Sequence, residues 1–88
     1  MLRLRESHII WREVDGETLV LDLRDSMYLS VNESAGVLWR VLAGGTTRDG
    51  LIDALATEYD LDRDEAAADV DAFLEDCRAR DYLDEDTQ

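Results

Sequence analysis

The sequence predicts a small α+β domain, in which a three-stranded antiparallel sheet is followed by three helices. Three observations predict this fold class. Residues 17–23 and 27–31 alternate their side chains with the period of β-strands, and Asp15-Gly16 separates the first of them from another strand-like segment. The residues after Asn32 repeat apolar side chains at the three- and four-residue spacing of helices. A chain of 88 residues has room for one domain with one modest core.

The predicted strands are residues 8–14, 17–23 and 27–31. Asp15-Gly16 lies between the first two and is a strong signal for a two-residue hairpin. Alternate apolar residues of the second and third segments share a face within each strand: Leu19, Leu21 and Leu23, and Met27, Leu29 and Val31. We therefore expect a meander with one apolar face that needs a cover.

Each predicted helix starts at a capping residue. Asn32 is the candidate N-cap of the first helix, and Thr46 or Thr47 that of the second. Asp62 opens the third, with Glu65 three residues later in a capping-box pattern. The apolar stripes are Ala35, Leu38, Trp39 and Leu42; Leu51, Ile52, Leu55 and Tyr59; and Ala66, Val70, Phe73, Leu74 and Cys77.

The composition is strongly acidic, with 22 Asp and Glu against nine Lys and Arg and a formal net charge of −13. A field of that sign repels nucleic-acid phosphates and anionic lipid. No apolar run approaches the roughly 20 residues that span a bilayer, and the N-terminus lacks the pattern of a signal peptide. We therefore expect a cytoplasmic domain over residues 1–83, with an acidic disordered tail at 84–88 and no nucleic-acid or membrane partner.

The sequence does not favour catalysis or metal binding. His8 and Cys77 are the only residues of their types, and they lie at a predicted strand end and on an apolar helix side, away from the base that a nucleophile needs. The alternating aspartates of residues 60–64 are similar to a calcium loop, but its sixth position is Glu65 instead of glycine. We expect no enzymatic activity, no cofactor and no metal.

A strand edge is the candidate binding surface. An uncovered edge presents unpaired N–H and C=O groups that invite a strand from another chain. The third predicted strand leads directly into the helices and is the candidate edge: Met27, Tyr28, Leu29, Ser30 and Val31. If the third helix lies alongside, one shoulder of it would form the opposite wall: Ala67, Asp71, Leu74 and Arg78. A peptide bound there would gain main-chain hydrogen bonds from the strand and side-chain pockets from the helix.

A carrier-protein function is an alternative. Asp25-Ser26-Met27 is similar to the Asp-Ser-Leu tripeptide whose serine carries phosphopantetheine in acyl and peptidyl carrier proteins. In that family the serine opens a helix of an all-helical fold. Ser26 instead precedes a predicted strand, which favours a simple turn residue.

Several short motifs occur in a fixed order from about Val14 to Leu83. They are Met27-Tyr28-Leu29-Ser30-Val31-Asn32, Ser34-Ala35-Gly36-Val37-Leu38-Trp39, Gly44-Gly45-Thr46-Thr47, Leu51-Ile52 with Leu55 and Tyr59, Asp69-Val70, Phe73-Leu74 and Tyr82-Leu83. In this order and at these separations, the chain resembles PqqD-like proteins, the recognition elements for ribosomally synthesised and post-translationally modified peptides (RiPPs). Val31 stands where many relatives have leucine, and the proline often found ahead of the first strand is absent.

The resemblance implies a winged helix-turn-helix-like fold and a non-catalytic module that binds a precursor's leader peptide as an added strand. The implied contacts are Met27, Tyr28, Leu29, Ser30 and Val31, with Ala67, Val70, Asp71, Leu74 and Arg78 on the third helix. In this assignment the strand contributes mainly backbone. Val31, Val70 and Leu74 would form hydrophobic pockets, while Asp71 and Arg78 would pair with leader charges.

The chain is most similar to the stand-alone modules of lasso peptide pathways. That likeness implies a leader peptidase as a second partner. A winged-helix DNA-binding regulator is the other interpretation of such a fold, but it requires a basic recognition helix. Residues 62–80 are predominantly acidic, which argues against DNA binding.

Overall fold

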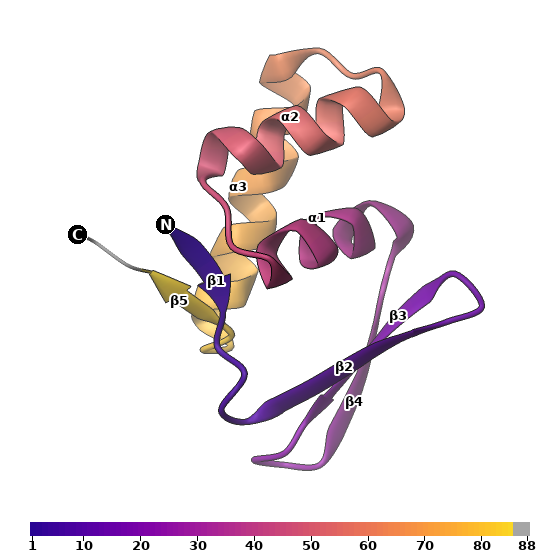
Figure 1. Cartoon of the computed structure of the whole chain (residues 1–88), viewed down its shortest axis with the longest axis vertical. Helices are drawn as coiled ribbons and strands as arrows, with labels where there is room; N and C mark the ends of the chain where they lie inside the picture. The colour runs from indigo at the N-terminus through magenta and orange to yellow at the C-terminus, as the bar shows by residue number, and fades with distance from the viewer. Residues whose placement is uncertain (86–88) are drawn as a thin grey trace.

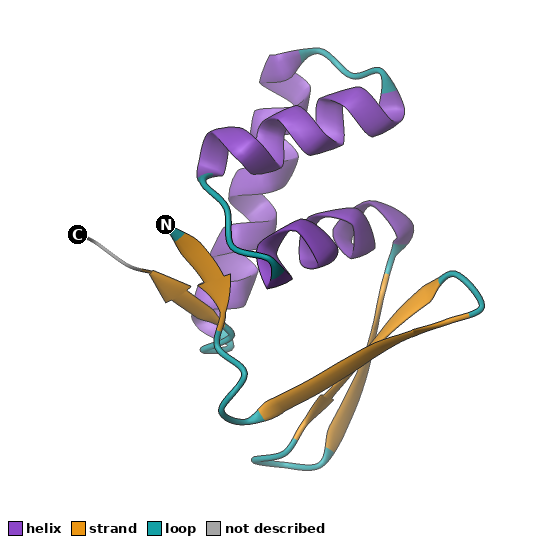
Figure 2. Ribbon diagram, viewed as in Figure 1, coloured by secondary structure: helices purple, strands orange, loops and turns teal. Residues whose placement is uncertain are grey.

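The computed structural model describes residues 1–85 and confirms the predicted α+β fold (Figure 1). The central sheet has the strand order β2-β3-β4 and is antiparallel throughout. Its strands are β2 (Ile9–Val14), β3 (Glu17–Asp22) and β4 (Met27–Val31). The helices that follow are α1 (Glu33–Ala43), α2 (Arg48–Tyr59) and α3 (Arg63–Ala79). Figure 2 shows this sheet as a layer apart from the helices, with α1 nearest to it.

The two ends of the described chain form a second sheet that the sequence analysis did not predict. β1 (Leu2–Leu4) pairs antiparallel with β5 (Leu83–Glu85), and the first residue of β1 exchanges two main-chain hydrogen bonds with Thr46. Three-residue strands carry too little alternation to be recognised in a sequence. β5 includes the first two residues of the tail expected at 84–88, and residues 86–88 lie outside the described part.

The β2–β3 hairpin has the predicted two-residue turn. Asp15 and Gly16 both have positive φ, 52° and 81°, which is the conformation of a type I′ turn. The four-residue turn after β3 places Asp22 opposite Met27, and consequently Val20 opposite Leu29.

This register corrects the expected sheet faces. The leucines of the second strand and the apolar residues of the third lie on opposite faces of the sheet. The face that α1 covers carries Thr18, Val20 and Asp22 of β3, all buried. The alternative set, Leu19, Leu21 and Leu23, points away from the helices.

The helix starts are close to those predicted. Asn32 caps α1 by accepting a hydrogen bond from the main-chain N–H of Ala35 at 2.8 Å, and Thr47 caps α2 through Gly50 at 3.1 Å. Asp62 precedes α3 as expected, but its side chain makes no capping hydrogen bond, so the predicted capping box is wrong. No helix within residues 1–85 is long and apolar enough to cross a membrane.

One core joins the sheet, the three helices and both chain ends. Trp39 of α1, 2% exposed, lies at its centre and makes edge-to-face contacts with the rings of Trp11 and Tyr82. Such aromatic pairs add to the stabilisation that burial of apolar surface provides. Because Trp11 is on β2 and Tyr82 precedes β5, the contacts of Trp39 fix the sheet and the C-terminal segment to α1.

Candidate functional site

β4 is an edge of the central sheet, and the turn geometry identifies the groups that it exposes. The two-residue turn makes Val14 and Glu17 a hydrogen-bonded pair, and such pairs alternate along an antiparallel ladder. On β3, the main-chain groups of Glu17, Leu19 and Leu21 therefore bond to β2. Those of Thr18, Val20 and Asp22 bond to β4. Their partners on β4 are Met27, Leu29 and Val31. Tyr28 and Ser30 consequently direct their N–H and C=O groups away from the sheet, toward the free edge.

A groove runs along this edge between β4 and α3. Its central cavity has a volume of about 250 Å³, which is smaller than the ~300–1,000 Å³ of typical small-molecule sites. Its lining comes from β3, β4, α1, α3 and the segment after α3: Val20, Leu29, Ser30, Val31, Asn32, Ala35, Trp39, Phe73, Asp76, Cys77, Arg80 and Tyr82. An apolar interior beside free main-chain groups is the surface that an added peptide strand requires.

The groove extends beyond the cavity at both ends. A hollow at the Met27 end shares Leu29, Arg80 and Tyr82 with the cavity. A second hollow lies between α1 and α3 and shares four residues with it: Asn32, Ala35, Phe73 and Asp76. The groove is therefore longer than the five-residue strand β4.

The helix face that lines the groove differs from the expected one. The cavity is lined by Phe73, Asp76, Cys77 and Arg80, which recur at the i, i+3, i+4 and i+7 spacing of one helix face. α3 packs its stripe of Ala66, Val70 and Leu74 into the core, and this rotation directs Phe73 toward the sheet. Phe73 and Cys77 belong to the apolar stripe that the helical spacing predicts. The spacing does not indicate that these two residues face the groove beside β4.

The structure places the five predicted α3 residues elsewhere. Val70 and Leu74 are 0% and 1% exposed and belong to the core, and Ala67 packs against that core. Asp71 accepts two hydrogen bonds from Arg48 of α2, at 2.7 and 2.9 Å. The fifth residue, Arg78, forms an ion pair with Glu85 of β5 at 2.8 Å. None of these five residues lines the central cavity, and a leader contact at any of them stays a prediction.

The predicted β4 residues do lie along the groove. Leu29, Ser30 and Val31 line the central cavity, and Met27 lines the adjoining hollow. The Tyr28 side chain is 73% exposed and lies on the outer face of the sheet. Tyr28 thus offers the groove only its main chain.

A buried polar network joins the two walls at the Met27 end of the groove. Asp22, 4% exposed, accepts hydrogen bonds from the Tyr82 hydroxyl at 3.0 Å and from the Arg24 guanidinium at 2.9 Å. Arg24 also donates to the main-chain carbonyl of Arg80 at 2.6 Å. The Arg24 hydrogen bonds hold the pKa of Asp22 far below its usual range, and burial raises the pKa of Tyr82. This network connects the end of β3 to the end of α3.

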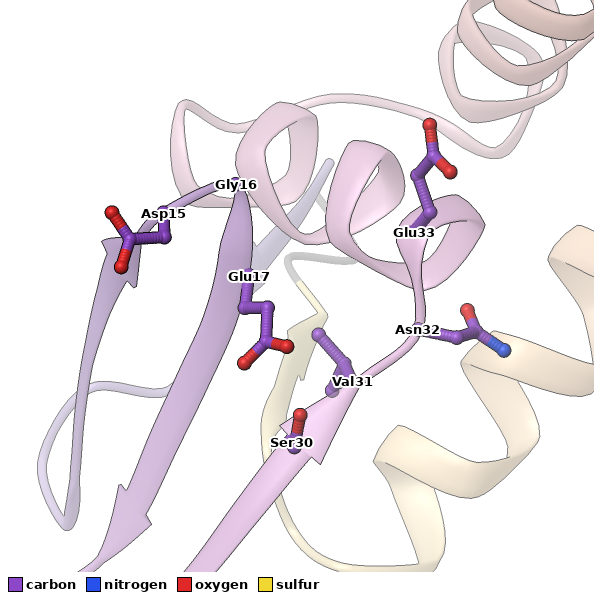
Figure 3. A pocket seen from close by; sticks show the side chains of 7 residues that line it. All are labelled: Asp15, Gly16, Glu17, Ser30, Val31, Asn32 and Glu33. Carbon is purple, nitrogen blue, oxygen red and sulfur yellow. The ribbon is translucent and has the colours of Figure 1, made fainter.

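The opposite end of the groove is acidic. A hollow of about 520 Å³ lies at the end of β4, lined by the acidic residues Asp15, Glu17 and Glu33 together with Val31 and Asn32. Figure 3 shows the Glu17 carboxylate directed toward Val31. None of the seven residues that line the hollow is basic. The negative field of these carboxylates favours a cationic group on a peptide that binds beside this hollow.

The outer face of the sheet is an apolar surface without a cover among the described residues. It is formed mainly by Ile10, Leu19, Leu21 and Tyr28, of which Ile10 is 51% exposed. Arg12 lies among them and makes no ion pair or hydrogen bond within residues 1–85.

Ser26 and Cys77 lie in settings unlike those of reactive groups. Ser26 occupies the turn before β4 with a φ of 56° and does not open a helix, as the serine of a carrier protein does. Burial raises the pKa of the Cys77 thiol to about 12, so it stays protonated at neutral pH. Within residues 1–85, no three His, Cys, Asp or Glu side chains are grouped so as to hold a metal ion.

Comparison with known proteins places these features in a family. The family model described as coenzyme PQQ synthesis protein D (PqqD) matches residues 17–83. No curated protein sequence matches the chain.

Two solved structures share the whole fold. "TbiB1 in Complex with the TbiA(beta) Leader Peptide" has a TM-score of 0.85 and 21% identity, and covers 98% of this chain and 99% of that chain. "Lasso peptide synthetase B1 complexed with the leader peptide" has a TM-score of 0.82 and 24% identity, with coverage of 96% and 98%.

Proposed function

Because this chain belongs to the PqqD family, we propose that it is a RiPP recognition element that binds the leader peptide of a ribosomally synthesised precursor. The observation that carries this proposal is the free edge of β4 beside an apolar groove. Tyr28 and Ser30 supply unpaired main-chain groups, and the cavity next to them accepts side chains. The two similar structures are complexes with leader peptides, which supports the same ligand class for this groove.

The leader would bind as a fourth strand against β4. Met27, Leu29 and Val31 would shape the groove from the sheet side, while Tyr28 and Ser30 would exchange main-chain hydrogen bonds with the leader. Alternate leader side chains point to opposite faces of a sheet, so every second one would enter the groove. There they would meet the α3 residues that line the cavity: Phe73, Asp76, Cys77 and Arg80.

We propose a lasso peptide pathway as the setting, because both similar structures are leader complexes and the second is named as a lasso peptide synthetase component. The protein would act in the cytoplasm, without catalysis of its own, and present the leader to a leader peptidase and other modifying enzymes. The outer sheet face offers the second surface that presentation needs. Ile10, Leu19 and Leu21 remain accessible there when the groove is filled, and Arg12 would pair with a carboxylate of the peptidase.

The test is a titration with the purified protein of a fluorescently labelled leader peptide, taken from any short open reading frame found beside this gene. Fluorescence polarisation should show saturable binding in the micromolar range or tighter. Binding should be lost when the leader's apolar anchors become alanine. A flat titration, both alone and with the peptidase present, would rule out leader recognition. Saturation only with the peptidase would show that the two proteins share the site.

A further inference from the structure

Asn32 lies where the parts of the groove meet. It follows the last residue of β4 and precedes the first residue of α1. Its side chain lines the central cavity, the hollow between α1 and α3, and the acidic hollow of Figure 3. A peptide that runs the length of the groove therefore passes this side chain, whichever hollow it enters after leaving β4.

The helix cap fixes the orientation of the Asn32 amide. Its Oδ1 accepts hydrogen bonds from the main-chain N–H of Ala35 at 2.8 Å and from the Ser34 hydroxyl at 3.1 Å. Only the carbonyl oxygen of an amide can accept these bonds, so Nδ2 occupies the other side. Figure 3 shows this nitrogen directed away from the sheet, toward α3. Within residues 1–85, Nδ2 has no hydrogen-bond partner.

The main-chain ladder of the edge ends at the same residue. Free edge groups recur every second residue, at Tyr28 and Ser30, about 6.8 Å apart in an antiparallel strand. Asn32 is the next position in this series. Its main-chain carbonyl accepts the N–H of Gly36 at 2.8 Å, because the chain turns there into α1. The side-chain amide is therefore the next donor that a peptide strand meets once the regular ladder stops.

From these contacts, we propose that Asn32 has two roles: Oδ1 caps α1, while Nδ2 donates a hydrogen bond to a main-chain carbonyl of the bound leader just beyond its paired segment. This inference rests on the proposed function. The hydrogen bond would fix the register in which the leader pairs with β4. Register needs such a fixed point, because main-chain pairing alone is the same for every residue of an extended peptide.

Two substitutions separate the roles. Asn32→Ser and Asn32→Asp both keep a capping oxygen and both remove the Nδ2 donor. Asn32→Ser should weaken binding of the labelled leader by about 3- to 10-fold, as loss of one hydrogen bond does. Asn32→Asp should weaken it further, because a carboxylate would face the leader's carbonyl oxygen. In both variants the melting temperature of the free protein should change by less than about 4 °C.

Thr47→Ala is the matched control, since it removes a cap of the same kind from α2, and Thr47 does not line the groove cavity. It should lower the melting temperature and leave the dissociation constant unchanged. Wild-type affinity in both Asn32 variants would overturn the inference, while binding by the wild-type protein would leave the proposed function intact. If the wild-type protein itself does not bind, the proposed function fails first.

Discussion

The main chain of β4 supplies the sharpest prediction, because neighbouring residues should respond in opposite ways to the same substitution. Ser30→Pro removes an N–H that faces the free edge, whereas Leu29→Pro removes one that bonds to β3. Proline is tolerated in a strand only where its N–H would face solvent. Ser30→Pro should therefore fold and lose leader binding, and Leu29→Pro should lose stability.

The size of the Ser30→Pro effect follows from the hydrogen bond that it deletes. The leader loses one main-chain partner, and its carbonyl oxygen is left unpaired against the edge. Leaving such a group unsatisfied costs about 1–3 kcal/mol, which corresponds to an affinity about 5- to 150-fold weaker at about 1.4 kcal/mol per tenfold. In the free protein the Ser30 N–H faces solvent and bonds to no other strand. Its removal should therefore change the melting temperature by less than about 4 °C.

Fluorescence polarisation and thermal denaturation of the same samples measure both effects. Glu13→Pro is the control, because alternation along β2 places the Glu13 N–H at the opposite edge of the sheet. It should leave leader affinity unchanged, and the exposed ion pair that it removes, between Glu13 and Arg40, contributes little to stability. Normal affinity in Ser30→Pro, with the fold intact, would show that the leader does not pair with β4.

Three further predictions concern α3 and the network at the Met27 end of the groove. Leu74→Ala should lower the free energy of unfolding by about 2–5 kcal/mol in chemical denaturation, whereas Phe73→Ala should weaken leader binding with a smaller loss of stability, because Phe73 is only partly buried. Tyr82→Phe should lower the free energy of unfolding by about 1.5–3 kcal/mol, since it removes a buried hydrogen bond to the Asp22 carboxylate. An unchanged melting temperature would contradict a stabilising role for this hydrogen bond. Asp22 has a lowered pKa in the folded protein, so its stabilisation is present above its unfolded pKa of about 4 and is lost as the pH falls toward the folded value. The free energies of unfolding of the wild type and Asp22→Asn should therefore differ by a constant amount well above pH ~4 and approach each other as the pH falls below it.

Local signals in the sequence predicted the elements of the fold well. The Asp15-Gly16 turn and the caps at Asn32 and Thr47 depend on residues at most four positions apart, so their chemistry can be read directly. The edge position of β4 was also predictable, because a strand that leads into helices has no later strand of the meander to cover it.

The orientation of the elements was not predictable to the same degree. Alternation divides β3 into two faces but does not say which face is buried. The buried face contains Asp22, which is stabilised by Tyr82 from 60 residues further along the chain, and no local pattern reveals that contact. The leucines of the other face remain partly accessible.

The helix α3 shows the same limit. Its apolar residues cover more than one face, so spacing alone allowed either Leu74 or Phe73 to face the sheet. The packing of Leu74 into the core decides between them, and it moves the helix wall of the groove by one residue. Replacing Leu74 with aspartate is expected to disrupt the fold, because the Leu74 side chain is 1% exposed.

The most direct test of leader binding by strand addition is amide hydrogen exchange, measured residue by residue with and without saturating leader peptide. The Tyr28 and Ser30 amides should exchange quickly in the free protein and become protected in the complex. The Leu29 amide, already bonded to β3, and the Trp11 amide, at the opposite edge, should change much less. Saturated binding with Tyr28 and Ser30 still exchanging as in the free protein would contradict strand addition at β4.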